Sequence, residues 1–597
     1  MALIEDYAII GDTQTVALVN RQGSIDWLCL PRFDSPACFA KLLGDDDNGE
    51  WSLAPVGAER CRSRRYVDGS LILETTWDLE GGSVTVTDYM PPRDRAVDVV
   101  RIVEGVSGRV DMRSELRLRF DYGHVVPWVR RVEDQLVGVA GPDAVYLRSD
   151  VQHHGEDLSS VAEFAVEAGQ RVSFVLTWHP SYEPPPTPVD PERSLASTRE
   201  YWDRWCNRCV TEGEYSDAVT RSLLTLKALT YSPTGGLVAA PTTSLPEELG
   251  GVRNWDYRYC WLRDATLTLE SMMHSGFTEE AIAWADWLLR AIAGTARDLQ
   301  IMYGVAGERR LMEYTAEWLS GYEGAAPVRI GNAAADQLQL DVYGEVMGAL
   351  ALARRMHIPG SMDSWPLQRA LTEHLEVIWK EPDEGLWEVR GPRQQFTHSK
   401  IMCWVAFDRA AAGVERFGLP GPGKRWRAIA DEIHREVCEQ GYDEERGAFV
   451  QAFGSKALDA AVLVMPRVGF LRGDDPRFVS TVHRVRDELS EDGFVRRYQT
   501  ADSDSKANVD GLPGREGAFL ACSFWLADAE YYMGEEQQAR ERFERLLDLR
   551  NDVGLLAEEY DPVSGRQLGN FPQAFSHLGL INTAYLLTGH PTLSLQR

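Results

Sequence analysis

The sequence predicts a chain in two parts: an N-terminal antiparallel β-sandwich followed by a C-terminal (α/α)6 barrel. Up to about residue 190, apolar residues alternate with polar ones in short runs, the pattern of half-buried strands. From residue 216 the apolar residues recur with the period of a helix, and the segments between the helices alternate in length. At 597 residues the chain is also too long for one ordinary hydrophobic core.

Residues 1–190 are expected to form the sandwich, because their short alternating runs are separated by Gly, Asn, Asp and Pro turns. One stretch, 23–43, is unusually aromatic and apolar. We expect it to belong to the sandwich core, with a lip against the neighbouring domain as the alternative. The strands expected from the alternation are Thr15–Asn20, Ser70–Trp77, Ser83–Tyr89, Val99–Val103, Glu115–Tyr122 and Val172–Trp178.

Residues 191–215 are predicted to link the two parts. The stretch 181–192 is rich in proline, which makes it stiff and extended rather than loosely flexible. A bridging helix is expected after it, over 193–210.

Residues 216–597 are predicted to form the barrel. Connections after even-numbered helical segments are short, whereas those after odd-numbered segments are long and rich in Gly, Pro, Trp and charge. Helices that run alternately up and down place all long connections on one rim, where a site is expected. A helical solenoid is the alternative, but the sequence lacks a repeat of fixed period. The expected segments are 216–231, 263–275, 278–296, 334–356, 362–379, 399–417, 424–440, 457–465, 475–490, 514–532, 535–550 and 573–587.

The first long connection carries the most distinctive stretch of the chain, 253–265, RNWDYRYCWLRDA. It combines four large aromatic residues with five charged ones. Aromatic faces beside fixed hydrogen-bonding charges suit a sugar pocket, because ring faces meet C–H surfaces and charged groups bind hydroxyls. The alternative is a structural entry into a helix with a few satisfied ion pairs.

Two glutamates on other long connections stand beside aromatic or apolar residues. Glu388 follows Trp387, and Glu558 follows a Leu–Ala pair. Such surroundings raise a carboxyl pKa by desolvation, and a pair of carboxylates on one rim fits glycoside hydrolysis. With 91 acidic residues in the chain, a chance pairing is the alternative. His398 and His577 lie nearby and are expected to be supporting or structural groups, since no nucleophile or metal-ligand spacing accompanies them.

Composition limits the partners. Acidic residues outnumber Lys and Arg by 91 to 62, a net charge of −29 that argues against nucleic acid. No secretory signal and no apolar run of about 18 residues is visible, which predicts no membrane partner and a cytoplasmic location. Nine irregularly spaced cysteines argue against a disulfide framework, and Cys206–Cys209 is interpreted as a chance CxxC. We expect no metal and no cofactor, and a homo-oligomer is possible.

The motifs together are similar to those of glycoside hydrolase family 15, which contains glucoamylases, glucodextranases and trehalases. The resemblance covers nearly the full length and implies the same sandwich and barrel. It also implies an inverting, exo-acting α-glucoside hydrolase that releases β-D-glucose from the non-reducing end. The motifs that carry it are GSIDWLCLPRFDSP, NWDYRYCWLRDA, PVRIGNAAADQLQLDVYGE, GLWEVRG, THSKIMCW, EGAFLACSFW and LLAEEYDP.

The resemblance also implies roles for individual residues. Glu388 of GLWE resembles the general acid, and Glu558 of LAEEYD resembles the general base, with Glu559 as the alternative one residue away. One departure concerns the residues after the acid. Fungal members have a second acidic residue there, whereas Val389 and Arg390 follow Glu388 in this chain, so contacts beyond the terminal glucose are expected to differ.

The same resemblance implies a set of substrate-binding residues. Arg263 and Asp264 are expected to act as a pair that clamps hydroxyls of the terminal glucose. This clamping sets the exo mode. Tyr257 is expected to stabilise an oxocarbenium-like transition state. The full set is Tyr257, Trp261, Arg263, Asp264, Arg329, Trp387 and Glu516.

The substrate is predicted to be a small α-glucoside, because no secretory signal is visible to bring the enzyme to extracellular starch. We rank α,α-trehalase first. The first alternative is an intracellular glucoamylase or glucodextranase that acts on α-1,4 or α-1,6 glucooligosaccharides. The second is a non-catalytic saccharide-binding protein, which the presence of both carboxylate motifs disfavours.

Overall fold

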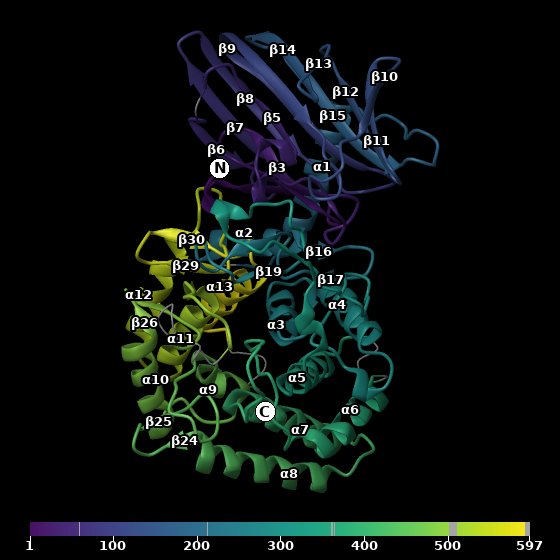
Figure 1. Ribbon diagram of the computed structural model, residues 1–597. Helices are drawn as coiled ribbons and strands as arrows, with labels where there is room; N and C mark the ends of the chain where they lie inside the picture. The colour runs from purple at the N-terminus through teal and green to yellow at the C-terminus, as the bar shows by residue number, and fades with distance from the viewer. Residues whose placement is uncertain (59, 212, 360–361, 363, 501–509, 591–597) are drawn as a thin grey trace.

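The protein consists of a large antiparallel sheet domain and a helical domain. The computed structural model describes residues 1–597 except 59, 212, 360–361, 363, 501–509 and 591–597. Figure 1 shows the sheet at the top, next to α2 and β16, and the helices below it, with α8 at the far end. Among the described residues, no helix has both the length and the apolar content that crossing a membrane requires.

Fifteen antiparallel strands form the sheet domain, which confirms the predicted class of this part of the chain. Its main path runs β1-β2-β3-β5-β9-β15-β12-β11-β10, and the remaining strands pair off this path. The strands are β1 Ala8–Gly11, β2 Val16–Val19, β3 Ser24–Cys29, β4 Ala37–Phe39, β5 Glu50–Pro55, β6 Ser63–Tyr66, β7 Leu73–Leu79, β8 Gly82–Tyr89, β9 Val97–Arg117, β10 Trp128–Val132, β11 Gln135–Ala140, β12 Asp143–Ser149, β13 His154–Glu156, β14 Ser159–Glu167 and β15 Arg171–Pro180.

Strand β9 corrects one prediction. The separate strands expected at 99–103 and 115–122 are parts of a single strand of 21 residues, which ends at Arg117. Its glycines permit close approach instead of ending the strand: a Cβ at Gly105 would lie 2.2 Å from the carbonyl oxygen of Glu167. The first half of β9 pairs with β8 and β15, and the second half with β5 and β14. The strand therefore joins the two halves of the domain.

The bridging helix is α1, Pro191–Cys206, which begins two residues earlier than expected. The Asp190 side chain accepts a hydrogen bond from the Arg193 N–H, and Pro191 occupies the first turn, where its missing N–H costs nothing. The helix contacts both parts of the protein. The Tyr89 hydroxyl of β8 donates to the Pro191 carbonyl, and the Trp205 ring stacks on Phe277 of the helical domain at 4.2 Å.

Twelve helices follow α1 among the described residues, and they form two rings, as an (α/α)6 barrel requires. The inner helices contact one another in a closed cycle, α3, α5, α7, the segment 460–468, α11, α13 and back to α3. Figure 1 shows them around the centre, with α4, α6, α8, α10 and α12 outside. The helices are α2 Ser216–Ala228, α3 Ala265–His274, α4 Thr278–Ala291, α5 Asp341–Arg355, α6 Trp365–Ile378, α7 Thr397–Phe417, α8 Gly423–Glu436, α9 Met465–Val468, α10 Pro476–Leu489, α11 Leu520–Tyr532, α12 Glu536–Leu547 and α13 Ala574–Leu587.

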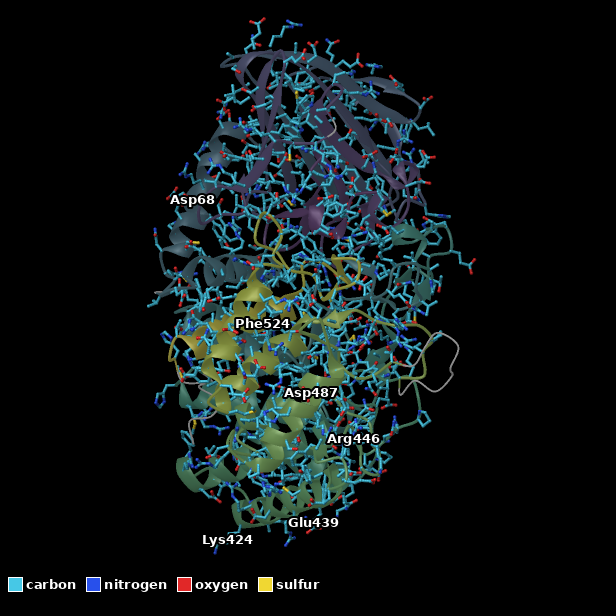
Figure 2. The ribbon with its side chains drawn as sticks, turned by 90° about the vertical axis from the view of Figure 1, so that its left-hand side faces the viewer. Asp68, Lys424, Glu439, Arg446, Asp487 and Phe524 are labelled. Atoms are coloured by element: carbon cyan, nitrogen blue, oxygen red, sulfur yellow. The ribbon has the colours of Figure 1, made fainter. Side chains whose placement is uncertain are left out.

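Hydrophobic patterning explains which helices lie inside. Every residue of α13 is buried, so this helix is apolar on all sides. Outer helix α8 buries only a stripe that includes Trp426, Ala430 and Ile433. In Figure 2, Lys424 of α8 lies at the end of the molecule farthest from the sheet, whereas Phe524 of inner helix α11 lies within the helical part.

One predicted helix is wrong in type. The segment expected at 457–465 is a 3₁₀ helix, Ala460–Val464, followed by the single turn of α9. The Asp459 side chain accepts a hydrogen bond from the Ala461 N–H, which starts the 3₁₀ segment. Pro466 fits the first turn of α9, and Gly469 with a positive φ of 80° ends it. The start signal at Asp459 and the end signal at Gly469 therefore keep this inner helical segment short.

The alternation of connection lengths is as predicted. Short connections are 275–277, 356–364, 418–422, 469–475 and 533–535, whereas the long ones are 229–264, 292–340, 379–396, 437–459, 490–519 and 548–573. The long connections contain short strands, β16 Thr230–Tyr231, β17 Gly236–Leu237, β18 Thr243–Pro246, β19 Asn254–Asp256, β20 Cys260–Trp261, β21 Met302–Tyr303, β22 Tyr314–Thr315, β23 Arg329–Ile330, β24 Tyr442–Asp443, β25 Ala448–Phe449, β26 Ser490–Glu491, β27 Phe494–Val495, β28 Ala518–Phe519, β29 Glu559–Asp561 and β30 Arg566–Leu568.

A buried ion pair joins the sheet domain to the first long connection. The Arg258 guanidinium donates to both oxygens of Asp256, at 2.9 and 2.7 Å, and to the carbonyl of Ser35 at 3.0 Å. It also lies 5.3 Å from the ring of Tyr122. The Trp27 indole donates to the carbonyl of Pro241 at 2.9 Å. The stretch 23–43 therefore serves both as sandwich core and as the contact with the barrel.

Candidate active site

A cavity with about 540 Å³ of empty space lies among the long connections. Four of the six long connections supply its lining residues, which are Glu247, Arg253, Trp255, Tyr257, Arg263, Asn332, Ala334, Trp387, Glu388, Arg390, Arg497, Tyr498, Asp510, Leu512 and Phe519.

Glu388 is held in a fixed position in the wall of this cavity. The Trp261 indole N–H donates to its carboxylate at 2.7 Å, and the Arg263 guanidinium donates to the same oxygen at 3.4 Å. Its backbone is in the left-handed region, with φ of 57°, which a residue other than glycine seldom adopts. Burial raises the pKa of Glu388, and the opposing charge of Arg263 and the Trp261 hydrogen bond only partly offset it. A carboxyl with a raised pKa can donate a proton near neutral pH.

Glu558 lies directly before β29 and is buried. Its carboxylate forms a hydrogen bond with the Tyr257 side chain and accepts another from the Asn570 N–H. Gly569 leaves room for it, because a Cβ there would lie 2.5 Å from a carboxylate oxygen of Glu558. Burial and the nearby Glu247 raise the pKa of Glu558, while Arg497 and the two hydrogen bonds lower it.

His577 supports the connection that carries Glu558. Burial lowers its pKa to about 3, so the ring is neutral. Its Nε2 accepts a hydrogen bond from the Leu556 N–H at 3.3 Å, which leaves Nδ1–H to donate to the Ser222 hydroxyl at 2.9 Å. The other histidine, His398, lines a second cavity on the barrel axis beneath Arg263. His577 therefore has the supporting contacts that were expected of it.

Tyr257 links the two glutamates. Burial is the main cause that raises the pKa of its hydroxyl, and the negative charges of Glu558, Glu247 and Glu388 raise it further. The hydroxyl is thus within electrostatic reach of both predicted catalytic carboxylates. The Trp261 ring packs edge-on against Tyr257, with ring centres 5.2 Å apart, and so fixes both.

A buried ionic cluster forms the wall beside Glu558. One Nη of Arg497 lies 2.9 Å from Glu247, 2.5 Å from Glu516 and 3.7 Å from Glu559. These three carboxylates could hold a metal by residue type, since their oxygens lie within 4.8 Å of one another. The guanidinium of Arg497 already occupies that position. The Glu559 carboxylate also accepts from the Gly517 N–H at 2.9 Å, so Glu559 faces the cluster.

A second arginine completes this cluster. Arg253 pairs with Asp510, and it also lies 3.6 Å from Glu516. Tyr498 donates to Asp510 at 2.9 Å. Four buried carboxylates, those of 247, 510, 516 and 559, thus meet two guanidinium groups. Ionised carboxylates beside a sugar ring favour the positive charge that develops in an oxocarbenium-like transition state.

The predicted binding residues fall into two groups. Tyr257, Arg263, Trp387 and Glu388 line the cavity. The others contact a residue that does: Trp261 donates to Glu388, Asp264 accepts from Arg263 at 3.1 Å, Arg329 lies over Trp255, Glu516 pairs with Arg497 and Glu558 interacts with Tyr257.

The fourth long connection contributes from behind the wall. Asp459 accepts a hydrogen bond from the Trp387 indole at 2.8 Å and so fixes the residue before Glu388. With Glu558 from the sixth connection, all six long connections take part in the site.

Sequence patterns missed several wall residues, and Arg497 is the most informative. It lies between Phe494 and Tyr498, in a long connection, which is the same mixture of charge and aromatic rings that marked 253–265. Its carboxylate partner Glu247 is 250 residues away in sequence. That distance left no local signal for the ion pair.

Comparison with known proteins agrees with this geometry. The sequence model described as glycosyl hydrolases family 15 matches residues 213–585, and one described as trehalase-like, N-terminal, matches residues 1–182. The chain belongs to glycosyl hydrolases family 15. It is a glycoside hydrolase by this membership.

Sequence similarity to known relatives extends over almost the whole chain. A trehalase of Mycobacterium tuberculosis (strain ATCC 25618 / H37Rv) is 41% identical, with 97% of this chain and 88% of the relative covered. A trehalase of Thermoplasma volcanium is 34% identical, with 97% and 93% covered. A crystal structure of a bacterial glucoamylase complexed with acarbose matches with a TM-score of 0.73 at 13% identity, and covers 99% of this chain and 94% of that one. That likeness shows the shared fold.

Proposed function

We propose that this glycoside hydrolase cleaves α,α-trehalose. Inversion takes place at the anomeric carbon of the glucose that is held deep in the cavity. The observation that carries the proposal is that Glu388 lines the cavity with Tyr257 and Arg263. Glu558, from a separate long connection, accepts from the N–H of Asn570, whose side chain donates to the carbonyl of the cavity residue Trp255. A pair of carboxyl groups around one sugar position is the arrangement that glycoside hydrolysis uses.

The roles are those that the sequence resemblance implies, because burial raises the pKa of both carboxyls. Glu388, whose pKa burial raises, donates a proton to the glycosidic oxygen as the bond breaks. Glu558 takes a proton from a water molecule that attacks the anomeric carbon on the opposite face. Glu559 is turned toward Arg497 and Gly517, which supports Glu558 as the base.

Two further groups act on the sugar itself. Arg263, paired with Asp264, is available to hold hydroxyls of the terminal glucose. Tyr257 and the ionised carboxylates of the buried cluster stabilise the positive charge that develops on its ring.

The choice of trehalose rests on the relatives, because proteins called trehalase cover 97% of this chain. A cytoplasmic location and a homo-oligomeric state belong to the same proposal as predictions from the sequence. A glucoamylase-type specificity for α-1,4 or α-1,6 linkages and a binding function without cleavage are outcomes that experiment distinguishes.

The first experiment compares glucose release from trehalose, maltotriose, isomaltose and soluble starch. We expect trehalose to be the best substrate. A preference for the glucans would establish the glucoamylase-type alternative instead, and release from none of them would favour a binding protein. Proton NMR gives the stereochemistry: inversion yields equal initial amounts of α- and β-glucose from trehalose, because the leaving sugar keeps its own α configuration. Initial α-glucose alone would contradict inversion.

Variants test the residue assignments. Glu388→Gln and Glu558→Gln are each expected to lower kcat by roughly 10²- to 10⁴-fold, the usual contribution of a general acid or base, without a change in melting temperature. Glu384→Gln is the matched control, because Glu384 lies on the same connection as Glu388 and binds Leu338 and Arg393. Near-normal activity of either catalytic variant would reject that assignment.

A further inference from the structure

Three charged residues surround Trp255 at one side of the cavity. The guanidinium carbon of Arg329 lies 4.4 Å from the centre of the Trp255 ring, and that of Arg390 lies 4.3 Å from it. Glu313 holds both arginines, with contacts of 3.8 Å to Arg329 and 3.0 Å to Arg390. Three different long connections meet in this group, which we call the Trp255 cluster and define as Trp255, Glu313, Arg329 and Arg390.

Backbone contacts make the cluster rigid. Arg329 donates to the carbonyls of Val252 and Asn254, at 2.9 and 3.0 Å, in the residues that lead into Trp255. The Arg390 N–H donates to the carbonyl of Asp510 at 2.9 Å. A guanidinium that is already ordered loses little entropy when it binds a ligand.

The exposure of the wall residues shows which part of the substrate the cluster meets. The exposed fraction of the side chain rises from 11% for Arg263 to 17% for Glu388 and 31% for Arg390. The cavity therefore runs from Arg263, at its deep end, past the catalytic acid to Arg390, near its mouth. A general acid must touch the oxygen that joins the two sugars, so the leaving sugar lies beyond Glu388, beside Arg390.

We propose that Arg390 binds hydroxyls of the leaving glucose and is a determinant of disaccharide specificity, with Glu313, Arg329 and Trp255 as its positioning residues. This inference rests on the proposed function. Glu313 accepts from both Nη groups of Arg390, and a guanidinium has five N–H donors, so donors are left for sugar oxygens. The position is two residues after the acid, where the sequence resemblance led us to expect contacts that differ from those of fungal members.

The test compares two substrates that differ only in the leaving group. In α-D-glucosyl fluoride, fluoride leaves and no second sugar is present. Arg390→Ala is expected to lower kcat/KM for trehalose by roughly 10- to 100-fold, mainly through KM, and to change kcat/KM for the fluoride by less than about twofold. Equal losses on both substrates, or no loss on trehalose, would overturn the proposal.

Further variants separate binding from structure. Arg393→Ala is the matched control, because Arg393 lies on the same connection and pairs with Glu384. Arg390→Lys keeps the charge but loses the planar fork, so it is expected to restore only part of the trehalose activity. Glu313→Gln is expected to raise KM for trehalose less than Arg390→Ala does. An equal or larger effect on glucosyl fluoride for Glu313→Gln would contradict its positioning role.

Failure of the proposed function would look different. A wild-type enzyme that cleaves glucosyl fluoride but not trehalose would contradict trehalose as the substrate. The Arg390→Ala variant would then be compared with the wild type on maltose or isomaltose, whichever the enzyme cleaves. On that disaccharide, an Arg390→Ala variant with unchanged kcat/KM would reject the leaving-sugar site independently.

Discussion

Removal of the Trp261 indole N–H should change the pH at which the enzyme loses activity. This group donates to the Glu388 carboxylate at 2.7 Å, and the donation lowers the pKa of Glu388 against the larger effect of burial. Trp261→Phe keeps a large apolar ring against Tyr257 but removes the donor. The carboxylate form of Glu388 then loses a stabilising contact, so its pKa should rise.

The magnitude follows from the type of hydrogen bond. A bond to a charged group contributes about 1.5–3 kcal/mol. Because one pKa unit corresponds to about 1.4 kcal/mol, the pKa of Glu388 should rise by roughly one to two units. Glu388 must be protonated to act as the acid, so the alkaline limb of the activity profile should move to higher pH by about the same amount.

The assay is kcat/KM as a function of pH, since this ratio reports groups of the free enzyme. The two limbs of the pH profile reflect both catalytic carboxyls together, so neither limb gives the pKa of a single residue. The pH profile of each variant is therefore compared with that of the wild type. Trp365→Phe is the control, because Trp365 is buried and donates to the carbonyl of Pro420 at 2.9 Å, far from the acid. An alkaline limb that stays in place or moves to lower pH in Trp261→Phe would refute the role of this hydrogen bond.

Two further variants test the base and the domain contact. Glu559→Gln is expected to leave most of the activity in place, because the Glu559 carboxylate faces Arg497 and accepts from the Gly517 N–H; loss of activity comparable to that of Glu558→Gln would instead assign the base to Glu559. Arg258→Met leaves the buried carboxylate of Asp256 without its partner, at a cost of about 3–5 kcal/mol, and should lower the melting temperature measured by calorimetry. Adding Asp256→Asn should recover part of the loss, and a double variant no more stable than the single one would contradict this account.

Local periodicity was enough to predict much of the fold. The twelve helical segments appear in the structure with a single change of type, at 460–468, and the alternation of connection lengths identified the rim that carries the site. Strand β9 shows the limit of local patterns. Gly105 resembles a turn signal in the sequence, but it is needed inside a strand, where the backbone of Glu167 approaches too closely for a side chain.

The candidate site was predictable where chemistry left a local trace. Glu388 and Glu558 stand beside apolar neighbours, and the structure buries Glu558 and leaves the Glu388 side chain only 17% exposed. By contrast, the ionic cluster of Glu247 with Arg497 joins segments distant in sequence, and no local pattern records which acidic residue meets which arginine. The Trp255 cluster is of the same kind, because each of its residues lies on a long connection whose course only the folded barrel fixes.

The stretch 253–265 shows why its mixture of rings and charges resisted a single interpretation. Its residues alternate in direction around β19. Trp255 and Tyr257 line the cavity, whereas Asp256 and Arg258 point to the other side and pair beneath the sheet domain. A shift of one residue in this segment would exchange the two sets. The contact of Arg258 with the sheet domain therefore fixes the register that turns Tyr257 into the cavity that Glu388 lines. We infer that the sheet domain helps to position Tyr257 in the cavity, even though its own residues do not line the cavity in the described part of the chain.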